Sequence, residues 1–309
     1  MDIDTLDINT NQPTTPSEKP AVGVPAPEAE WPGGGILNRP QPTLFRVYDD
    51  GNAERKLIGS TCFFRNRALL LTILEQLNPE AETVSVLVHA ASIGCDAYSF
   101  VIAYDLFFQG RRSPRLQCFA TDLSESFLDR ARRAIYGREI LGEMGAKERR
   151  YFEDWDEEHC RVRTDIRERV TFLPAASYVD FSSARSFDVV FLVNTLLYVT
   201  PADQTRALNQ VARYNRRLLV TNRFHADQVR DDMRRNGYEP VPNRLEMIYN
   251  GFIPCQPPSP GTMIDGVTHC SPAMEPLRGC EDYSYRFGCL FAKPDSPEVA
   301  SPLSQPAEL

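Results

Sequence analysis

Long hydrophobic runs are missing from this 309-residue sequence, and no apolar stretch approaches the roughly 18 residues that a membrane-spanning helix requires. The first residues, MDIDTLD, contain neither the basic region nor the apolar region of a secretion signal. Clusters of basic residues are also lacking, since the net charge is -8 and the arginine pairs lie scattered among acidic residues. Because phosphate binding needs clustered lysine and arginine, we expect no nucleic-acid partner. Since both a membrane span and a secretion signal are missing, we expect a cytoplasmic protein with no membrane partner.

Paired cysteines at the short spacing of a zinc site are absent too, although the chain has eight cysteines. Cys62, Cys95 and Cys118 lie in or beside apolar segments, so they are predicted to be free thiols. A looser group lies near the C-terminus and consists of Cys255, Cys270, Cys280, Cys289 and His269. Its spacing fits no zinc pattern, and we predict no metal site.

The distribution of proline divides the chain. Residues 1–42 hold eight of the 24 prolines and a Gly-Gly-Gly run with few large aliphatic residues, which predicts a disordered tail. The stretch 295–309 is again rich in proline, serine and glutamate and is predicted to be a second disordered tail. The folded domain is therefore expected to span residues 43–294, with a short acidic insert at 153–169.

Between the tails, β-branched apolar runs alternate with segments of helical periodicity. Strands are predicted at 84–90, 115–120, 169–173, 187–193 and 217–221, with further candidates at 245–249 and 285–292. Helices are predicted at 96–109, 125–135, 201–214 and 226–236. Ser124 is placed as an N-cap, and Gly237 ends the last helix. This alternation predicts an α/β fold whose mostly parallel sheet has helices on both faces.

Ligands of such sheets lie at the carboxyl ends of the strands, so the residues that follow each strand are the candidate site. Gly94 follows the first strand and permits a tight turn before a helix, whose free N–H groups can meet a ligand. Asp122 follows the second strand and can accept both hydroxyl protons of a ribose, although it could instead cap the next helix. Asn194 ends the strongest strand, and Tyr198 beyond it could equally be a core tyrosine.

Five motifs in order resemble those of the CheR-type chemotaxis-receptor glutamate methyltransferases. They lie within about residues 58–293 and are TCFFR at 61–65, AASIGCDAYS at 90–99, ATDL at 120–123 with Ala131 to Tyr136, RYF at 150–152, and FDVVFLVNTLLY at 187–198. The family counterparts are Thr-x-Phe-Phe-Arg, Ala-Ala-Ser-x-Gly-Glu-Glu-Pro-Tyr-Ser, Ala-x-Asp-Ile, Arg-Tyr-Phe and Phe-Asp…Arg-Asn-x-x-x-Tyr. The resemblance implies a Rossmann-like class I methyltransferase fold with a seven-stranded sheet, and residues 43–294 would be its methyltransferase domain.

The resemblance also implies roles for individual residues. Arg65 and Tyr198 would be the catalytic pair that faces the transferred methyl group and the acceptor. The cofactor S-adenosyl-L-methionine would be bound by Ala91, Ser92, Gly94, Asp96, Asp122 and Asn194. A glutamate acceptor, with a pKa of about 4.3, is already an anionic nucleophile at pH 7 and needs no general base. None of the four histidines falls at a motif position.

The sequence departs from the family pattern at several positions. A loop glutamate is replaced by Cys95, a proline by Ala97, an arginine by Val193, and an Asn-Leu pair by Ala176-Ser177. The family's basic helical domain upstream of the Phe-Phe-Arg element is not recognisable, and the insert at 153–169 corresponds to a shortened β-subdomain.

Three functions remain open at this stage. The first is a methyltransferase that modifies a carboxylate of a protein or a small molecule. The second is a catalytically degenerate S-adenosylmethionine-binding regulatory protein, which the departures from the motifs suggest. The third is a nucleotide-dependent oxidoreductase, which the missing Gly-x-Gly-x-x-Gly turn disfavours.

Overall fold

The computed structural model describes residues 31–32, 45–48, 58–222, 227–252, 263–264, 267–268, 279 and 282–294. Most of the two predicted tails lies outside these ranges, as do Cys255, Cys270, Cys280 and His269. Within the described ranges, no helix has both the length and the apolar character needed to cross a membrane.

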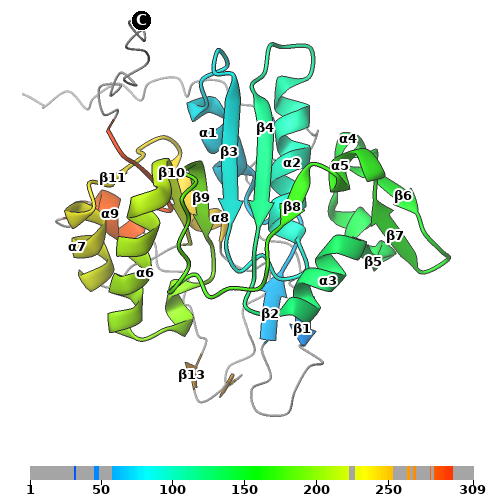
Figure 1. Ribbon diagram of the computed structural model, residues 1–309. Coiled ribbons are helices and arrows are strands. Elements are labelled where there is room, and N and C mark those ends of the chain that lie inside the picture. The colour runs from blue at the N-terminus through cyan, green and yellow to red at the C-terminus, as the bar shows by residue number, and fades with distance from the viewer. Residues whose placement is uncertain are drawn as a thin grey trace, which may run out of the picture.

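A seven-stranded sheet with the order β11-β14-β10-β9-β3-β4-β8 forms the centre of the molecule (Figure 1). Its strands are β3 (Thr83–Val88), β4 (Arg115–Ala120), β8 (Val170–Phe172), β9 (Phe187–Leu192), β10 (Asn215–Thr221), β11 (Glu239–Pro240) and β14 (Leu290–Ala292). Neighbours from β10 to β8 pair in parallel, whereas β14 pairs antiparallel with both β10 and β11. The predicted mostly parallel, Rossmann-like sheet is confirmed.

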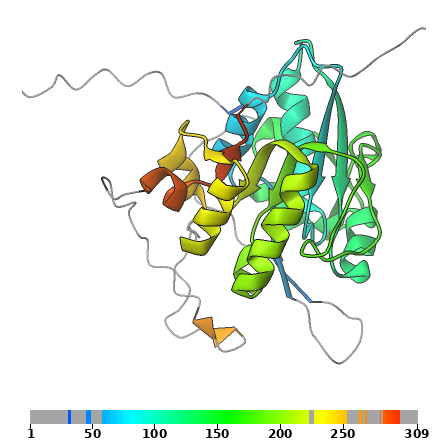
Figure 2. The same cartoon turned by 60° about the vertical axis from the view of Figure 1, so that its left-hand side comes forward.

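Helices cover both faces of the sheet (Figures 1 and 2). The first face carries α1 (Arg67–Gln76), α2 (Cys95–Phe108) and α8 (Leu245–Gly251), and the second carries α6 (Pro201–Tyr214) and α7 (Asp227–Arg235). Alternate strand residues separate the two cores, since Val86 and Val88 belong to the first and Leu87 to the second. Burial on both sides explains why the strands are continuous apolar runs in the sequence.

Smaller elements surround this sheet. Beside α3 (Glu125–Arg133) lies a small β-subdomain. Its three-stranded antiparallel sheet consists of β5 (Ile135–Gly137), β7 (His159–Val162) and β6 (Phe152–Asp154), and its short helices are α4 (Ala146–Arg149) and α5 (Thr164–Arg167). The insert predicted at 153–169 is therefore part of a folded β-subdomain. The remaining described elements are β1 (Phe45–Tyr48), β2 (Ile58–Thr61), β12 (Met263–Ile264), β13 (Val267–Thr268), α9 (Tyr283–Phe287) and the 3-10 helices Arg138–Glu143 and Leu196–Tyr198.

Two predicted strands are wrong in whole or in part. The segment 245–249 is helical and belongs to α8, where Ile248 and Tyr249 are buried. The segment 285–292 begins in α9, turns at Gly288 and becomes a strand only at β14. Both segments are short and apolar, and runs of this length do not distinguish a buried strand from a short buried helix.

Candidate active site

Left-handed backbone conformations gather at the carboxyl edge of the sheet. Phe64, Ala90, Ser92 and Asn194 have φ between 46° and 54°, and Gly94 has a φ of 90°. A residue with a Cβ atom is rarely stable in this region, so tertiary contacts must hold each one in place. Ala90 and Ser92 follow β3 and Asn194 follows the neighbouring β9, whereas Phe64 comes from the segment between β2 and α1, so strained backbone is concentrated where these strands end.

The loop after β3 is tied directly to the end of β4. The Ser92 N–H donates to Oδ2 of Asp122 at 2.7 Å, and the Ala91 N–H donates to the carbonyl of Thr121 at 3.0 Å. The Ser124 N–H donates to the other carboxylate oxygen, Oδ1, at 2.9 Å. Asp122 therefore ties the loop after β3 to the turn that leads into α3 (Glu125–Arg133), whereas the N-cap of that helix is Ser124, as predicted.

Gly94 is required for packing as well as for its turn. A Cβ atom at this position would lie 3.0 Å from the ring of Tyr98 and 3.1 Å from the side chain of Ala131. The Tyr98 hydroxyl donates to the Ala131 carbonyl at 2.8 Å, and the Tyr136 hydroxyl donates to the Ile93 carbonyl at 2.7 Å. Two tyrosines of the motifs thus fix the loop after β3, one through packing against Gly94 and one through a hydrogen bond to Ile93.

A third loop and an exposed leucine complete the surroundings of Asp122. The Ala176 N–H donates to the Asp122 carbonyl at 2.9 Å, which places the Ala176-Ser177 pair beside this residue. Leu123 leaves 58% of its surface exposed. Leu123 belongs to the ATDL motif but is not among the predicted site residues. Its position could have indicated a role, because an apolar residue directly after the ribose-binding candidate Asp122 can form the apolar wall that a nucleobase needs.

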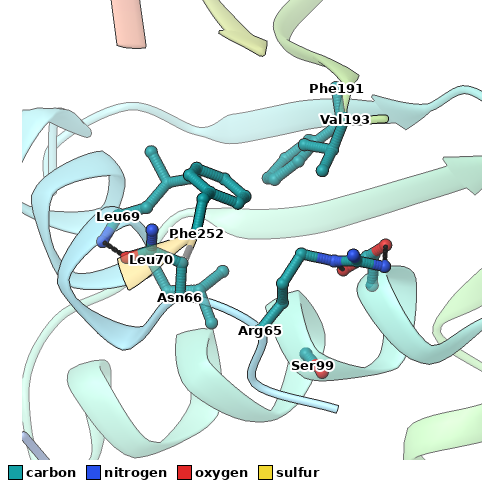
Figure 3. Close-up of a pocket in the computed structure, with 9 residues that line it drawn as sticks. Arg65, Asn66, Leu69, Leu70, Ser99, Phe191, Val193 and Phe252 are labelled. Carbon is teal, nitrogen blue, oxygen red and sulfur yellow. Dashed lines mark hydrogen bonds and ion pairs between the residues drawn. The ribbon is translucent and has the colours of Figure 1, made fainter. Parts of the chain in front are cut away.

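Arg65 is buried just before α1 and lines a small, partly open cavity of about 20 Å³ (Figure 3). Its Nε and Nη2 atoms lie 3.4 and 3.5 Å from the two carboxylate oxygens of Asp96, in the first turn of α2. Asp96 is 20% exposed. The remaining lining residues are Asn66, Leu69, Leu70, Ser99, Phe191, Val193 and Phe252. The cavity therefore joins an ion pair to a largely apolar wall.

The electrostatics of this cavity keep Arg65 charged. Burial opposes the charge, but Asp96, with Cys62 and Cys95 nearby, raises the pKa of Arg65 above its ordinary value. Tyr198 is 61% exposed, and its pKa is raised by partial burial and lowered by the charge of Arg65, with a net rise. The two residues predicted to be catalytic thus lie close enough for the charge of one to act on the other.

Residues from the other motifs support this site. The Phe64 N–H donates to the Ser99 hydroxyl at 2.8 Å, and the Phe63 ring packs edge-on against Tyr136 and Phe152, with centroids 4.9 and 5.1 Å away. The motifs therefore contact one another across the first core.

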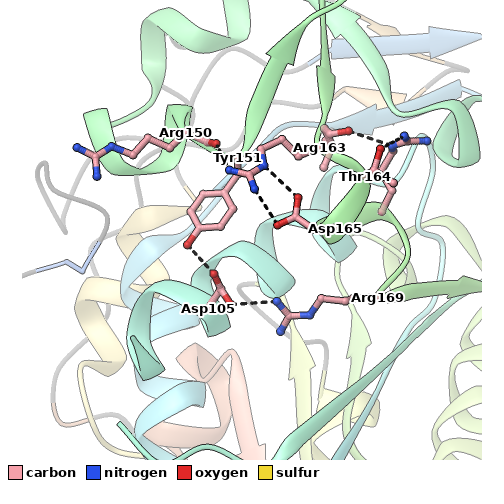
Figure 4. A network of polar contacts seen from close by, with 9 residues as sticks. Asp105, Arg150, Tyr151, Arg163, Thr164, Asp165 and Arg169 are labelled. Atoms are coloured by element: carbon pink, nitrogen blue, oxygen red, sulfur yellow. Dashed lines mark hydrogen bonds and ion pairs between the residues drawn. The ribbon is translucent and has the colours of Figure 1, made fainter. Parts of the chain in front are cut away.

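The RYF motif also fixes the β-subdomain (Figure 4). The Tyr151 hydroxyl donates to Asp105 at 2.7 Å, and Arg169 pairs with the same carboxylate at 3.0 Å. Arg163 donates to the Arg150 carbonyl and pairs with Asp165. Because Asp105 belongs to α2, this network ties the β-subdomain to the helix that starts at the site.

The described histidines and cysteines take no position in the site that would suggest a base or a metal. His89 is buried beside Tyr214, and His159 lies in β7 of the β-subdomain. The predicted free thiols Cys62, Cys95 and Cys118 are confirmed, and burial raises the pKa of Cys95 well above its ordinary value. Over the described ranges, no cluster of three histidine, cysteine or carboxylate side chains could hold a metal ion.

The residues present fit an adenosyl ligand. The Ser92 hydroxyl is buried without a hydrogen-bond partner in the described part of the chain, and it lies in the loop that meets Asp122. Asp122 would supply a carboxylate to a ribose, and the Arg65–Asp96 pair would present both charges to an amino-acid end. The strand order brings Gly94, Asp122 and Asn194 to one edge, as predicted.

The strand order and this edge define the chain as a class I methyltransferase fold. Residues 59–218 match the family described as CheR methyltransferase, SAM binding domain, so the chain belongs to the CheR methyltransferase family. The predicted cofactor, S-adenosylmethionine, is confirmed by this match.

Two chemotaxis methyltransferases are similar in sequence to part of this chain. The chain is 30% identical over 163 residues to chemotaxis protein methyltransferase 1 of Vibrio cholerae serotype O1, which covers 50% of this chain and 59% of that protein. It is also 30% identical over 151 residues to chemotaxis protein methyltransferase 1 of Pseudomonas aeruginosa, covering 45% of this chain and 55% of that protein. The crystal structure of the glycopeptide N-methyltransferase MtfA with S-adenosylmethionine aligns with a TM-score of 0.34 and 16% identity, covering 54% of this chain and 57% of that one. The chain thus spans less than two thirds of these relatives.

Proposed function

We propose that the chain is an S-adenosylmethionine-dependent methyltransferase that methylates a carboxylate oxygen, as in the protein-glutamate O-methyltransferases. The observation that carries this proposal is the buried Arg65, which lines a cavity beside the loop after β3 and faces the partly exposed Asp96 there. The planar guanidinium presents its donors in a fork that matches the two oxygens of a carboxylate, so an arginine at a cavity wall is suited to hold a carboxylate acceptor.

The residues at the sheet edge divide the binding work. Asp122 accepts the ribose hydroxyls, and the two N–H groups that it already binds hold its carboxylate in a fixed orientation. Leu123 offers its exposed apolar surface to the nucleobase. At the amino-acid end of the cofactor, Asp96 attracts the ammonium group and Arg65 attracts the carboxylate. Asn194, which follows β9, closes the other side of the site.

S-adenosylmethionine supplies an electrophilic methyl group on a sulfonium. The protein then needs to orient the acceptor in line and to exclude water. Arg65 holds the acceptor carboxylate and the Tyr198 hydroxyl donates to it, whereas Leu69, Val193 and Phe252 form the dry wall. Because an ionised carboxylate is already a nucleophile, the reaction needs no general base and therefore no histidine in that role.

The test is transfer of labelled methyl from S-adenosylmethionine to a set of glutamate-containing peptides and small carboxylic acids. A methyl ester releases methanol at alkaline pH, whereas an N-methyl or C-methyl product does not. The proposal is supported if alkali releases labelled methanol from the wild-type product and if this release is lost in Arg65→Ala and Asp122→Ala. Transfer that gives only base-stable product contradicts the carboxylate acceptor.

A catalytically degenerate binding protein is the second candidate, and Cys95 is the observation that favours it. Its thiol is buried and its pKa is raised, so at neutral pH it supplies no anion where the family pattern has a glutamate. Isothermal titration together with the transfer assay distinguishes the two functions. Tight binding of S-adenosylmethionine without transfer to any acceptor in the set supports the regulatory protein.

A further inference from the structure

Trp31 is docked on the folded domain, although it comes from the proline-rich stretch. Only 3% of its surface is exposed, and it belongs to the first hydrophobic core. Its ring meets that of Phe64 edge-on with centroids 6.2 Å apart, and its indole N–H donates to Oε1 of Glu148 at 2.7 Å. A tryptophan with both its apolar body and its single donor satisfied is a specific contact.

Glu148 makes this contact part of a larger network. The carboxylate is fully buried and accepts from Nε and Nη2 of Arg67 at 2.9 and 2.8 Å, and from the Gly145 N–H at 2.6 Å. Trp31 is a further donor to the same group. The indole thus satisfies a carboxylate that water does not reach, and the carboxylate in turn fixes the arginine in the first turn of α1.

The same contacts confine Phe64. Its ring contacts both Trp31 and the guanidinium of Arg67, whose Cζ is 5.3 Å from the ring centroid. Its backbone has a φ of 46°, a conformation that a residue with a large side chain adopts only under constraint. Arg65 follows immediately, so the orientation of the Phe64 peptide sets the direction in which the Arg65 side chain leaves the backbone.

We propose that Trp31 is a positioning residue that acts through Phe64 to direct Arg65 toward Asp96 and the cavity. This inference rests on the proposed role of Arg65 in cofactor and acceptor binding. Without the indole, Phe64 loses one wall, and the strained turn relaxes toward the ordinary right-handed region. The 3.4 Å pairing of Arg65 with Asp96 is loose enough to be lost in this relaxation.

A double-mutant cycle tests the proposal with S-adenosylmethionine affinity, measured by isothermal titration on the full chain. Trp31→Ala is expected to weaken binding by about 5- to 10-fold in the wild-type background and to have no effect in the Arg65→Ala background, since coupled residues are non-additive. An equal loss in both backgrounds overturns the proposal, because Trp31 would then act on the fold in general. Unchanged affinity in Arg65→Ala alone would instead contradict the proposed function of Arg65.

Two further variants keep the test decisive if Trp31→Ala does not fold. Trp31→Phe retains a ring against Phe64 and is expected to restore most of the affinity. Trp155→Ala, which removes a tryptophan that is 51% exposed in the β-subdomain, is the matched control and should bind normally. In Trp155→Phe, the only tryptophan left is Trp31, and its emission should be blue-shifted and resist acrylamide. Emission typical of a solvent-exposed indole overturns the proposal.

Discussion

Two buried arginines at the start of α1 behave in opposite ways. Arg67 makes a close two-pronged contact with Glu148, at 2.8 and 2.9 Å, and that carboxylate is fully buried. Arg65 meets Asp96 at 3.4 and 3.5 Å, and that carboxylate is 20% exposed at the wall of a cavity. Both arginines are about 5% exposed, so burial alone does not separate them.

The difference lies in what each carboxylate has left to offer. Glu148 uses both oxygens on protein donors, so its pair is closed and holds Trp31, α1 and α4 together. The pair of Arg65 and Asp96 is loose and faces a cavity, so it can reorganise when a ligand carboxylate or ammonium enters. A closed pair stabilises the fold, whereas an open pair is suited to binding.

The largest effect is expected where the closed pair is broken. Glu148→Ala leaves Arg67 buried without its counter-charge and should lower the free energy of unfolding by about 3–5 kcal/mol. Urea unfolding followed by circular dichroism measures this change. Glu75→Ala is the control. It removes a carboxylate of α1 whose ion pair with Arg244 is partly exposed, and it should lower the free energy of unfolding by no more than about 1 kcal/mol. Equal losses of unfolding free energy in Glu148→Ala and Glu75→Ala would contradict a special stabilising role for the buried Arg67–Glu148 pair.

The open pair should show the reverse pattern. Arg65→Ala is expected to weaken S-adenosylmethionine binding and methyl transfer by about 10- to 100-fold, the value of hydrogen bonds to charged groups. Its unfolding free energy should change much less than that of Glu148→Ala, because water can reach the Asp96 that remains. Titration and urea unfolding of the same samples check both parts. A large loss of stability with unchanged affinity would make Arg65 structural.

The sequence predicts the open pair better than the closed one. Arg65 and Asp96 lie in motifs, and strand–helix alternation places the ends of β3, β4 and β9 at one edge, as the structure has them. Glu148 lies 81 positions from Arg67, in a four-residue helix with no periodicity, and only the folded chain brings them together. Trp31 was concealed by the composition around it, since one anchored side chain does not change a proline-rich average.

Other features could not be derived for similar reasons. Helix α8 and helix α9 are too short for their apolar residues to distinguish a helix from a strand. The tight packing of Gly94 against Tyr98 and Ala131 depends on the distance between three elements, which the turn alone does not specify. Local periodicity thus predicts elements and edges, whereas contacts between distant segments need the structure.

His89 extends the comparison to a buried group whose partner is a hydroxyl. Its Nε2 lies 2.9 Å from the Tyr214 hydroxyl, and burial lowers the pKa of His89 from 6.5 to about 3. The unfolded chain therefore binds a proton below pH 6.5 that the folded protein does not, so stability falls as the pH drops from 6.5 toward 3. At pH 5 this amounts to about 2 kcal/mol.

Urea unfolding at pH 7.5, 6 and 5 measures the His89 contribution. His89→Gln should remove most of this part of the pH dependence, at the expense of stability at neutral pH. His159→Gln changes a half-exposed histidine and is the control. If the His89→Gln and wild-type profiles run parallel, the buried histidine does not titrate in this range.

The smallest effect is expected at Tyr198, where Tyr198→Phe removes one hydroxyl. The ring is 61% exposed, so the free energy of unfolding should not change measurably. Because the hydroxyl is assigned to the acceptor, methyl transfer should fall by about 10-fold, or about 1.4 kcal/mol, while S-adenosylmethionine affinity stays constant. Tyr136→Phe is the matched control, since its buried hydroxyl holds the Ile93 carbonyl and its loss should lower stability and cofactor affinity together. If Tyr198→Phe also weakens cofactor binding, the hydroxyl belongs to the cofactor side of the cavity, and Arg65 alone would face the acceptor.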